Sequence, residues 1–211
     1  VHLKMTLVLR KSLWITLNFN NHMRVENKMV NKVYYTWKDI EHMIDTVNNL
    51  MFADNWRPDY IVGMTRGGLV PAVMMSNKTG IIMHALDVRF RDTDPDYVGP
   101  ESNCWMAEDA FGYQGDGLSH ISHRKNILVF DDINDSGKTM QWIKEDWRAG
   151  CLPNDKGWDT VWGNNVRFAS LLDNQSSNFG EVDYTAMEIN KMEKDVWVVF
   201  PWEGEREYGQ F

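Results

Sequence analysis

The stretch from Ile127 to Thr139 decides the fold and reads Ile-Leu-Val-Phe-Asp-Asp-Ile-Asn-Asp-Ser-Gly-Lys-Thr. Its first four residues, Ile127–Phe130, form a short apolar run that is typical of a buried strand. Two adjacent carboxylates, Asp131 and Asp132, follow directly, and Ser136–Thr139 then opens a run with helical periodicity. A strand, an acidic turn and a helix in this order predict the carboxyl edge of a parallel sheet, where such folds bind ligands.

The residue types in this stretch suit a phosphorylated sugar. Carboxylates accept hydrogen bonds from vicinal hydroxyls and bind Mg²⁺ together with substrate oxygens, so Asp131 and Asp132 are candidates for both roles. The predicted helix N-terminus at Ser136–Thr139 offers free N–H groups to a phosphate. Gly-Lys-Thr also ends the loop of many nucleoside triphosphatases, but that loop needs a glycine where this chain has Asp132. An acidic turn that caps a helix and binds nothing is the remaining alternative.

A second strand-to-helix turn, Gly63-Met64-Thr65-Arg66-Gly67-Gly68-Leu69-Val70-Pro71, places an arginine between small residues. The helix N-terminus can bind an anion, and the Arg66 guanidinium can donate two hydrogen bonds to phosphate oxygens. Taken alone, Arg-Gly-Gly is also compatible with a flexible turn. Its value as a binding motif therefore depends on the first stretch.

Helix and strand patterns alternate along the rest of the chain. A capping box at Thr36 and Asp39 predicts the start of an amphipathic helix. From Phe90 to Arg124 the pattern dissolves, which predicts a long loop. We expect an α/β fold, with a mainly parallel twisted sheet and flanking helices, in a single domain over residues 32–211, and residues 1–31 as a poorly structured or non-native extension. The expected helices are 36–52, 69–78 and one ending at Gly150, and the expected strands are 59–64, 81–88, 127–130, 166–172, 184–189 and 196–202.

Composition bounds the class of protein. The chain has 211 residues, a hydrophobic content of 43% and a net charge of −8, which favours one soluble domain without the basic surface that non-specific nucleic-acid binding needs. No run of about 18 apolar residues is present that could cross a membrane. Cys104 and Cys151 lie far apart without metal-ligand spacing, which fits a reducing cytoplasm. His120 and His123 have helical spacing but no third ligand nearby, so we expect polar loop residues rather than a metal site.

Together, the two turns resemble the substrate loops of type I phosphoribosyltransferases, in particular the bacterial xanthine and hypoxanthine-guanine enzymes. The resemblance covers about Tyr34 to Glu203. It implies that Asp131 and Asp132 hold the ribose hydroxyls of phosphoribosyl pyrophosphate (PRPP), and that Asp135 takes part in proton transfer near N7 of a purine. It also implies that Arg66 and Gly67 contact pyrophosphate and that the peptide bond after Arg66 can be cis. The residues implied for the 5′-phosphate are Asp135, Ser136, Gly137, Lys138 and Thr139.

The tail Asp195-Val196-Trp197-Val198-Val199-Phe200-Pro201-Trp202-Glu203 resembles the small hood of bacterial xanthine-guanine enzymes, here about residues 173–211. The resemblance implies that Trp197 stacks on the purine and that Val198 offers backbone groups to its edge. It also implies that Glu203, with Asp131 and Asp132, helps to hold Mg²⁺. Without the resemblance, these aromatic side chains would be ordinary core residues of an edge strand.

One departure from the family pattern concerns the acceptor base. Relatives that act on 6-oxopurines carry a Lys that contacts the exocyclic oxygen, at about the position of Asn174 in this chain. An Asn side chain can donate to an oxygen or accept from an amino group, so it leaves the base open. Tyr97 is a candidate aromatic residue of a lid over the site.

The resemblance predicts an enzyme of purine salvage with Mg²⁺ as cofactor, which transfers the phosphoribosyl group of PRPP to hypoxanthine, guanine or xanthine and releases pyrophosphate. Two alternatives stay open. One is the same transfer to adenine or a pyrimidine, and the other is a non-catalytic regulator of the same fold that senses PRPP. The sequence allows a homo-oligomer and does not decide it.

Overall fold

The computed structural model describes residues 31–88, 104–194 and 196–203. The chain divides after Asn31 into two units, and the fold described below is that of the second. Residues 1–30 of the predicted 1–31 extension and the candidate lid residue Tyr97 lie outside the described residues, whereas Asn31 is described and begins a strand. Within those residues no helix is long and apolar enough to cross a membrane.

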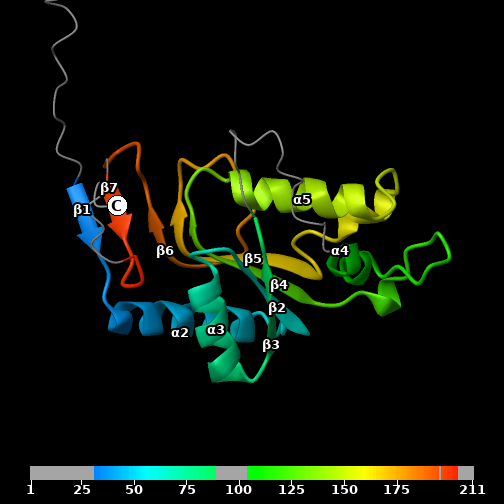
Figure 1. Cartoon of the computed structure of the whole chain (residues 1–211), viewed down its shortest axis with the longest axis horizontal. Coiled ribbons are helices and arrows are strands. Elements are labelled where there is room, and N and C mark those ends of the chain that lie inside the picture. The colour runs from blue at the N-terminus through cyan, green and yellow to red at the C-terminus, as the bar shows by residue number, and fades with distance from the viewer. Residues whose placement is uncertain (1–30, 89–103, 195, 204–211) are drawn as a thin grey trace, which may run out of the picture. The chain divides into compact units, whose positions relative to one another are not determined.

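The central sheet of this unit has five parallel strands (Figure 1). This arrangement confirms the predicted α/β class. The order β3-β2-β4-β5-β6 places β4, with the acid pair, in the middle of the sheet. The strands are β2 (Tyr60–Met64), β3 (Ile82–Leu86), β4 (Ile127–Asn134), β5 (Val166–Asn174) and β6 (Tyr184–Ile189).

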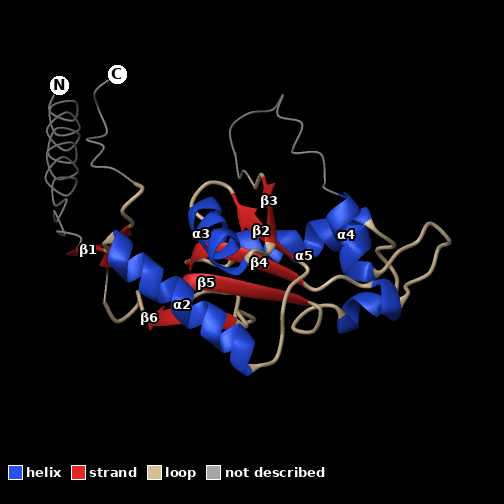
Figure 2. Ribbon diagram, turned by 90° about the horizontal axis from the view of Figure 1, so that it is seen from below, coloured by secondary structure: helices blue, strands red, loops and turns tan. Residues whose placement is uncertain are grey.

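Helices cover both faces of the sheet (Figures 1 and 2). Helices α2 (Trp37–Ala53) and α3 (Leu69–Thr79) pack with Leu128 and Phe130 of β4 in one hydrophobic cluster. Helices α4 (Cys104–Phe111) and α5 (Lys138–Gly150) pack with Ile127 and Val129 in the other. Alternate β4 side chains thus point to opposite helical layers, which is why the strand is apolar throughout its first half. Short 3₁₀ turns lie at Ile121–His123 and Lys156–Thr160.

Helix α2 begins where the capping box predicts. The Asp39 N–H donates to Thr36 Oγ1 at 3.3 Å, and the Thr36 N–H donates to Asp39 Oδ2 at 2.8 Å. Two of the N–H groups that a helix start leaves unpaired are therefore satisfied. The buried side chains recur at three- and four-residue steps and are Ile40, Met43, Ile44, Val47 and Met51.

The segment 90–124 differs from the prediction of a structureless loop. Residues 104–111 form α4, because Met106, Ala107, Ala110 and Phe111 bury one side of the helix against the core. The helix is too short for its periodicity to stand out among the surrounding Gly, Asp and Ser residues. Residues 89–103 lie outside the described residues.

Strand β4 is longer than its apolar run. Instead of turning after Phe130, it continues to Asn134, since Asp131, Ile133 and Asn134 pair with β5. The acid pair is therefore part of the sheet edge itself. Its backbone is fixed by the ladder, which positions both carboxylates more rigidly than a free turn would.

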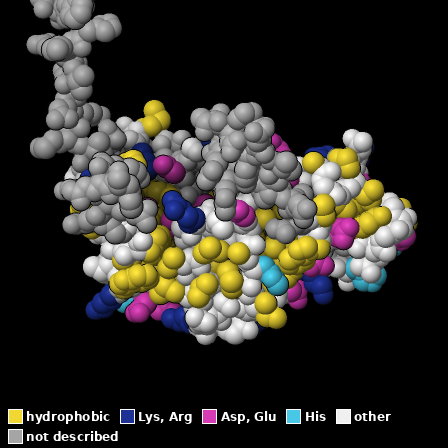
Figure 3. Space-filling view, viewed as in Figure 1, with side chains coloured by type: hydrophobic (Ala, Val, Ile, Leu, Met, Phe, Trp, Pro, Cys, Tyr) yellow, Lys and Arg dark blue, Asp and Glu magenta, His cyan; other side chains and the backbone are white. Residues whose placement is uncertain are grey.

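A second, two-stranded sheet joins β1 (Asn31–Tyr34) to β7 (Val196–Val199). Strand β7 ends earlier than the predicted 202, because the chain turns at Phe200, whose carbonyl accepts a hydrogen bond from the Glu203 N–H at 3.0 Å. Part of the range predicted for the hood, Tyr184–Ile189, belongs to the central sheet as β6. Elsewhere, apolar side chains reach the surface around β3 and α3, where Val73 and Ile82 are exposed (Figure 3).

Candidate active site

Two loops meet at the carboxyl edge of the sheet. Strands β2 and β4 are parallel neighbours from Tyr60–Ile127 to Gly63–Phe130, so the segments that follow them leave the sheet side by side. We call Thr65–Gly68 the Arg66 turn and Asp135–Thr139 the Asp135 loop. The structure thus brings together the two motifs that the sequence places far apart, with the acid pair between them.

The glycines of the Arg66 turn lie directly against the acid pair. A Cβ atom on Gly67 would lie 1.8 Å from Asp132 Oδ2, and one on Gly68 would lie 2.6 Å from the Phe130 carbonyl oxygen. A Cβ at position 67 would displace the Asp132 side chain, and one at position 68 would displace the backbone of β4 or the turn. The sequence Arg-Gly-Gly is therefore a requirement of close packing here, and not only of flexibility.

Arg66 is held at this edge by the residue before it. Thr65 Oγ1 donates to Asp87 Oδ1 at 2.7 Å and accepts from the Val88 N–H at 3.1 Å, which ties the turn to the end of β3. The peptide bond between Thr65 and Arg66 is cis. The expected position was the bond after Arg66, so the structure moves it by one residue. The Arg66 side chain is exposed, and α3 begins three residues later with its N–H groups toward the same edge.

Burial and mutual repulsion make the acid pair costly to ionise. Burial raises the pKa of Asp131 well above its usual range, and the neighbouring charge of Asp132 raises it further. Burial also raises the pKa of Asp132 to about 6, with Glu203 adding to the effect, although hydrogen bonds from Asp131 and the Ile133 N–H oppose it. Ribose hydroxyls or a cation would relieve this cost by pairing with the carboxylates.

Carboxylates are ligands that Mg²⁺ prefers, so Asp131 and Asp132 suit a magnesium ion. Within the described ranges, no three His, Cys, Asp or Glu side chains lie close enough together to hold a metal, so Glu203 does not complete a site with the acid pair. The acid pair by itself fits a Mg²⁺ that takes most of its ligands from substrate and water, as is usual for magnesium bound with phosphates.

The Asp135 loop leads into the N-terminus of α5. Gly137 has a left-handed φ of 82°, and a Cβ there would lie 2.6 Å from Phe179 Cβ and 2.8 Å from Ser177 Oγ. Only glycine combines this φ with this close approach. Helix α5 begins at Lys138, so its first N–H groups and the positive end of its dipole face the space above the loop.

Two buried asparagines hold the Asp135 loop from below. The Asn134 amide donates to Asp173 Oδ1 at 2.7 Å and to the Phe179 carbonyl at 2.9 Å. Its oxygen accepts from Ser177 Oγ at 3.0 Å. Asn134 thereby fixes the segment against which Gly137 packs.

Asn174 holds the loop from the end of β5. Its Nδ2 donates to the Asp135 carbonyl at 3.0 Å, and its Oδ1 accepts from Ser176 Oγ at 2.8 Å and from the Lys191 N–H at 3.1 Å. The side chain is buried, with 5% exposure. The amide expected to contact the base is thus engaged at both ends by the protein, so this geometry makes Asn174 a positioning residue of the loop.

Lys191 is a site residue that the sequence reasoning missed. Its Nζ lies 2.9 Å from Asp135 Oδ1. The residue comes two positions after the end of β6, and β6 is the parallel neighbour of β5, so both strands end at this same edge. A Lys directly after the last strand of a parallel sheet was the available signal.

The C-terminal tail contributes through its turn and its aromatic side chains. Glu203 Oε2 accepts from the Phe200 N–H at 3.1 Å, and the charge of Glu203 contributes to the raised pKa of Asp132. Phe200 and Trp202 stack with their ring centroids 4.7 Å apart. On β7, Val198 is buried and Trp197 is 58% exposed, which leaves its indole face open to a flat ligand.

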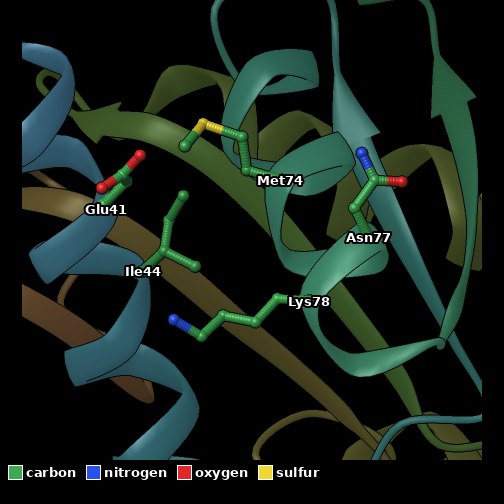
Figure 4. Close-up of a pocket in the computed structure, with 5 residues that line it drawn as sticks. All are labelled: Glu41, Ile44, Met74, Asn77 and Lys78. Carbon is green, nitrogen blue, oxygen red and sulfur yellow. The ribbon is translucent and has the colours of Figure 1, made fainter.

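A shallow groove lies elsewhere, between α2 and α3, and has a volume of about 390 Å³ (Figure 4). Asn77 and Lys78 belong to the last turn of α3, so most of that helix, roughly 12 Å at its usual rise per residue, separates them from the Arg66 turn. Lys78 forms an ion pair with Asp45. The groove is therefore not part of the candidate site. Its lining residues are Glu41, Ile44, Met74, Asn77 and Lys78.

A parallel α/β sheet with an acid pair between two helix-opening turns at its carboxyl edge is the arrangement of a protein that binds sugar phosphates or nucleotides. A family model described as the phosphoribosyl transferase domain matches residues 31–207. The chain belongs to this family and is a phosphoribosyltransferase.

Individual relatives agree with this assignment. The chain is 27% identical over 154 residues to the xanthine-guanine phosphoribosyltransferase of Cereibacter sphaeroides. It is 25% identical over 155 residues to that of Roseobacter denitrificans, and each match covers 72% of this chain and 72% of the relative. The crystal structure of a purine phosphoribosyltransferase from Pyrococcus horikoshii has the same fold. Its TM-score is 0.54 at 23% identity, over 86% of this chain and 99% of that chain.

Proposed function

We propose that this phosphoribosyltransferase moves the 5-phosphoribosyl group of PRPP onto a 6-oxopurine, namely hypoxanthine, guanine or xanthine, in purine salvage. One observation carries the proposal: Gly67 lies against the Asp132 carboxylate, so the Arg66 turn and the acid pair that precedes the Asp135 loop share one edge of the sheet. Carboxylate acceptors beside two helix N-termini suit a ligand that carries both a diol and phosphate groups. The names of the curated relatives and the Trp197–Glu203 tail favour a purine.

In this proposal each part of PRPP has its own partner. The ribose hydroxyls donate to Asp131 and Asp132, whose burial costs they offset. The 5′-phosphate accepts hydrogen bonds from the Asp135 loop and the first N–H groups of α5, with the hydroxyls of Ser136 and Thr139 and the Lys138 ammonium as further donors. Pyrophosphate lies against the Arg66 guanidinium and the Gly67 N–H.

In this proposal Asp131 and Asp132, joined by Glu203, would hold Mg²⁺, which when bound would supply positive charge to the leaving pyrophosphate. A base nitrogen gives its lone pair to the anomeric carbon, and the bond from that carbon to the pyrophosphate oxygen breaks with its electron pair on the oxygen. The proton that the imidazole ring loses passes to the Asp135 carboxylate. Trp197 stacks on the base, Val198 offers backbone groups to its edge, and preorganised donors around the phosphates stabilise the separating charges.

We also propose that residues 32–211 form one domain that contains all of these binding and catalytic residues. The family match over residues 31–207 supports it. The small sheet of β1 and β7, with the turn to Glu203, then acts as the hood over the base.

The test is nucleotide formation by the purified chain with PRPP, Mg²⁺ and each nucleobase supplied separately. We expect the nucleotides of hypoxanthine, guanine or xanthine together with one pyrophosphate per nucleotide, and no product without Mg²⁺. Product with adenine or a pyrimidine alone would replace the proposed acceptor by that base. PRPP binding without turnover on any base would instead indicate a regulator of the same fold.

A further inference from the structure

Ser170 is a buried polar residue in the middle of β5 that the proposed function does not use. Its side chain has 0% exposure, and its Oγ has no hydrogen-bond partner among the residues that the structure describes. A buried hydroxyl without a partner destabilises the folded state, and alanine fills nearly the same volume without that cost. The hydroxyl of Ser170 therefore needs an explanation beyond packing.

The register of the sheet places Ser170 beside the acid pair. Asp131 of β4 and Ser170 of β5 are register partners in two parallel strands. Register partners point to the same face of a parallel sheet, and each face repeats at every second residue. Val129 and Phe168, two residues earlier on the two strands, pack in one hydrophobic cluster, which agrees with a shared face. The Ser170 hydroxyl and the Asp131 carboxylate thus lie on one face of the sheet, one strand apart.

The spacing and the chemistry of the two side chains suit one hydrogen bond. Adjacent strands lie about 4.8 Å apart, and the serine Oγ changes its direction by rotation about a single bond. Asp131 Oδ1 accepts from the Asp132 N–H at 2.9 Å. Because a carboxylate has about four acceptor positions, Asp131 keeps the capacity to accept from a further donor.

The neighbour of Ser170 on its other side is a weaker acceptor. Thr185 of β6 is the second register partner of Ser170, and its Oγ1 donates to the Met187 carbonyl at 3.2 Å. A hydrogen bond to a carboxylate is roughly twice as strong as one between two neutral groups. The Ser170 hydroxyl therefore pairs better with Asp131 than with Thr185.

We propose that Ser170 is a positioning residue of the ribose site, whose hydroxyl donates to the Asp131 carboxylate and holds that carboxylate toward the ribose. This inference rests on the proposed function, in which Asp131 and Asp132 accept from the ribose hydroxyls. It adds the group that orients one of the two acids. The bond forms as Asp131 turns to the sugar, so the buried hydroxyl gains its partner in the complex and strengthens sugar binding.

The test compares sugar phosphates that differ by one hydroxyl. Binding of ribose 5-phosphate, 2-deoxyribose 5-phosphate and 3-deoxyribose 5-phosphate is measured by calorimetry in Mg²⁺-free buffer, so that only the protein contacts the diol. We expect the wild-type chain to prefer ribose 5-phosphate over both deoxy sugars. Ser170→Ala should reduce one of these two preferences, that for the hydroxyl held by Asp131, about tenfold, the lower end for a hydrogen bond to a charged group.

Stability measurements separate this role from a structural one. Ser170→Ala should leave the midpoint of urea unfolding of the free chain unchanged or raise it, because it removes an unpaired buried hydroxyl. A lower midpoint with unchanged sugar preferences would make Ser170 a structural residue and overturn the inference. Ser170→Thr keeps the donor and should keep both preferences. Ser170→Cys is close to serine in size with a weaker donor, and its preference should lie between those of wild type and the alanine variant.

Thr185→Val is the matched control, because it removes a hydroxyl from the same register row, one strand farther from Asp131. It should leave both sugar preferences unchanged. A loss of the ribose preference in Thr185→Val and not in Ser170→Ala would assign the role to Thr185 and overturn the inference.

The outcomes also separate this inference from the function on which it rests. If the wild-type chain prefers ribose 5-phosphate and Ser170→Ala keeps both preferences in full, the inference alone is overturned. If the wild-type chain binds all three sugar phosphates equally, the acid pair does not hold the diol. The ribose assignment of the proposed function then fails, and the inference fails with it.

Discussion

The Arg66 turn and the Asp135 loop are held in place by different physical means. The turn is positioned by close packing, with Gly67 so near Asp132 that no side chain fits between them. The loop is positioned by hydrogen bonds, chiefly those of the buried amides of Asn134 and Asn174. Steric contact fails abruptly when an atom is added, whereas a hydrogen-bonded support weakens by steps. Variants of the two loops should therefore differ in how much function they lose.

The largest effect should come from the chemistry of the Asp135 loop itself. Asp135→Asn keeps the size of the side chain and removes its capacity to take a proton. We expect turnover to fall by about 10²- to 10⁴-fold, the usual contribution of a general base. PRPP affinity, measured by calorimetry, should change little, because the loop N–H groups remain. Wild-type turnover with every purine tested would remove the proposed role of Asp135.

The Arg66 turn should tolerate almost no added side-chain atoms. Gly67→Ala places a Cβ 1.8 Å from the present position of Asp132 Oδ2, so the Asp132 carboxylate must shift. A displacement of this order costs roughly 10²-fold in an active site, and we expect kcat/KM to fall by about that factor. Gly180→Ala is the matched control, because no atom lies within 4 Å of its added Cβ. Equal activity of the two variants would contradict the packing account.

The hydrogen-bonded loop should weaken by a smaller step. Asn174→Ala removes the donor to the Asp135 carbonyl and the acceptor for the Lys191 N–H. We expect the free energy of unfolding to fall by about 2 kcal/mol and KM for PRPP to rise several-fold, as measured by urea unfolding and by steady-state kinetics. Asn178→Ala controls for position, since its backbone N–H still donates to the Ser136 carbonyl. An unchanged KM would mean that Asn174 does not support the loop.

The sequence could predict the two loops but not how they are supported. The apolar run of β4, the acid pair and the Gly-Lys-Thr helix start are local patterns, and the parallel order of strands follows from their alternation with helices. The close contact of Gly67 with Asp132 and the ion pair between Lys191 and Asp135 connect segments that are distant in sequence. Their distances depend on strand order, which one sequence does not specify.

Two features of the chain escape local pattern for the same reason. Asn174 stands at the position expected for the base contact, which stays a prediction, and its amide also pairs with the Asp135 carbonyl and the Lys191 N–H at the sheet edge. Helix α4 was missed because its four buried residues only become a helix face once the core is there to cover them. A local sequence pattern shows which residue types are present. Tertiary contacts decide which backbone groups their side chains pair with and which helices their burial stabilises.

The smallest predicted effect concerns the acid pair, which lies next to both loops, and is a pH dependence of stability. The pKa of Asp132, about 6, lies above the usual value near 3.9 of an unfolded chain, so the folded state binds the proton more tightly. Its contribution to stability is present below pH 4 and is lost as pH rises through 6. In Mg²⁺-free buffer, Asp132→Asn should therefore lose less stability than wild type between pH 4 and 7, by about 1 kcal/mol, since solvent reaches part of the pair. Urea unfolding at several pH values measures this difference. Identical pH slopes would show that Asp132 is already ionised at pH 4, and packing by Gly67 would then act on a carboxylate that carries no burial cost.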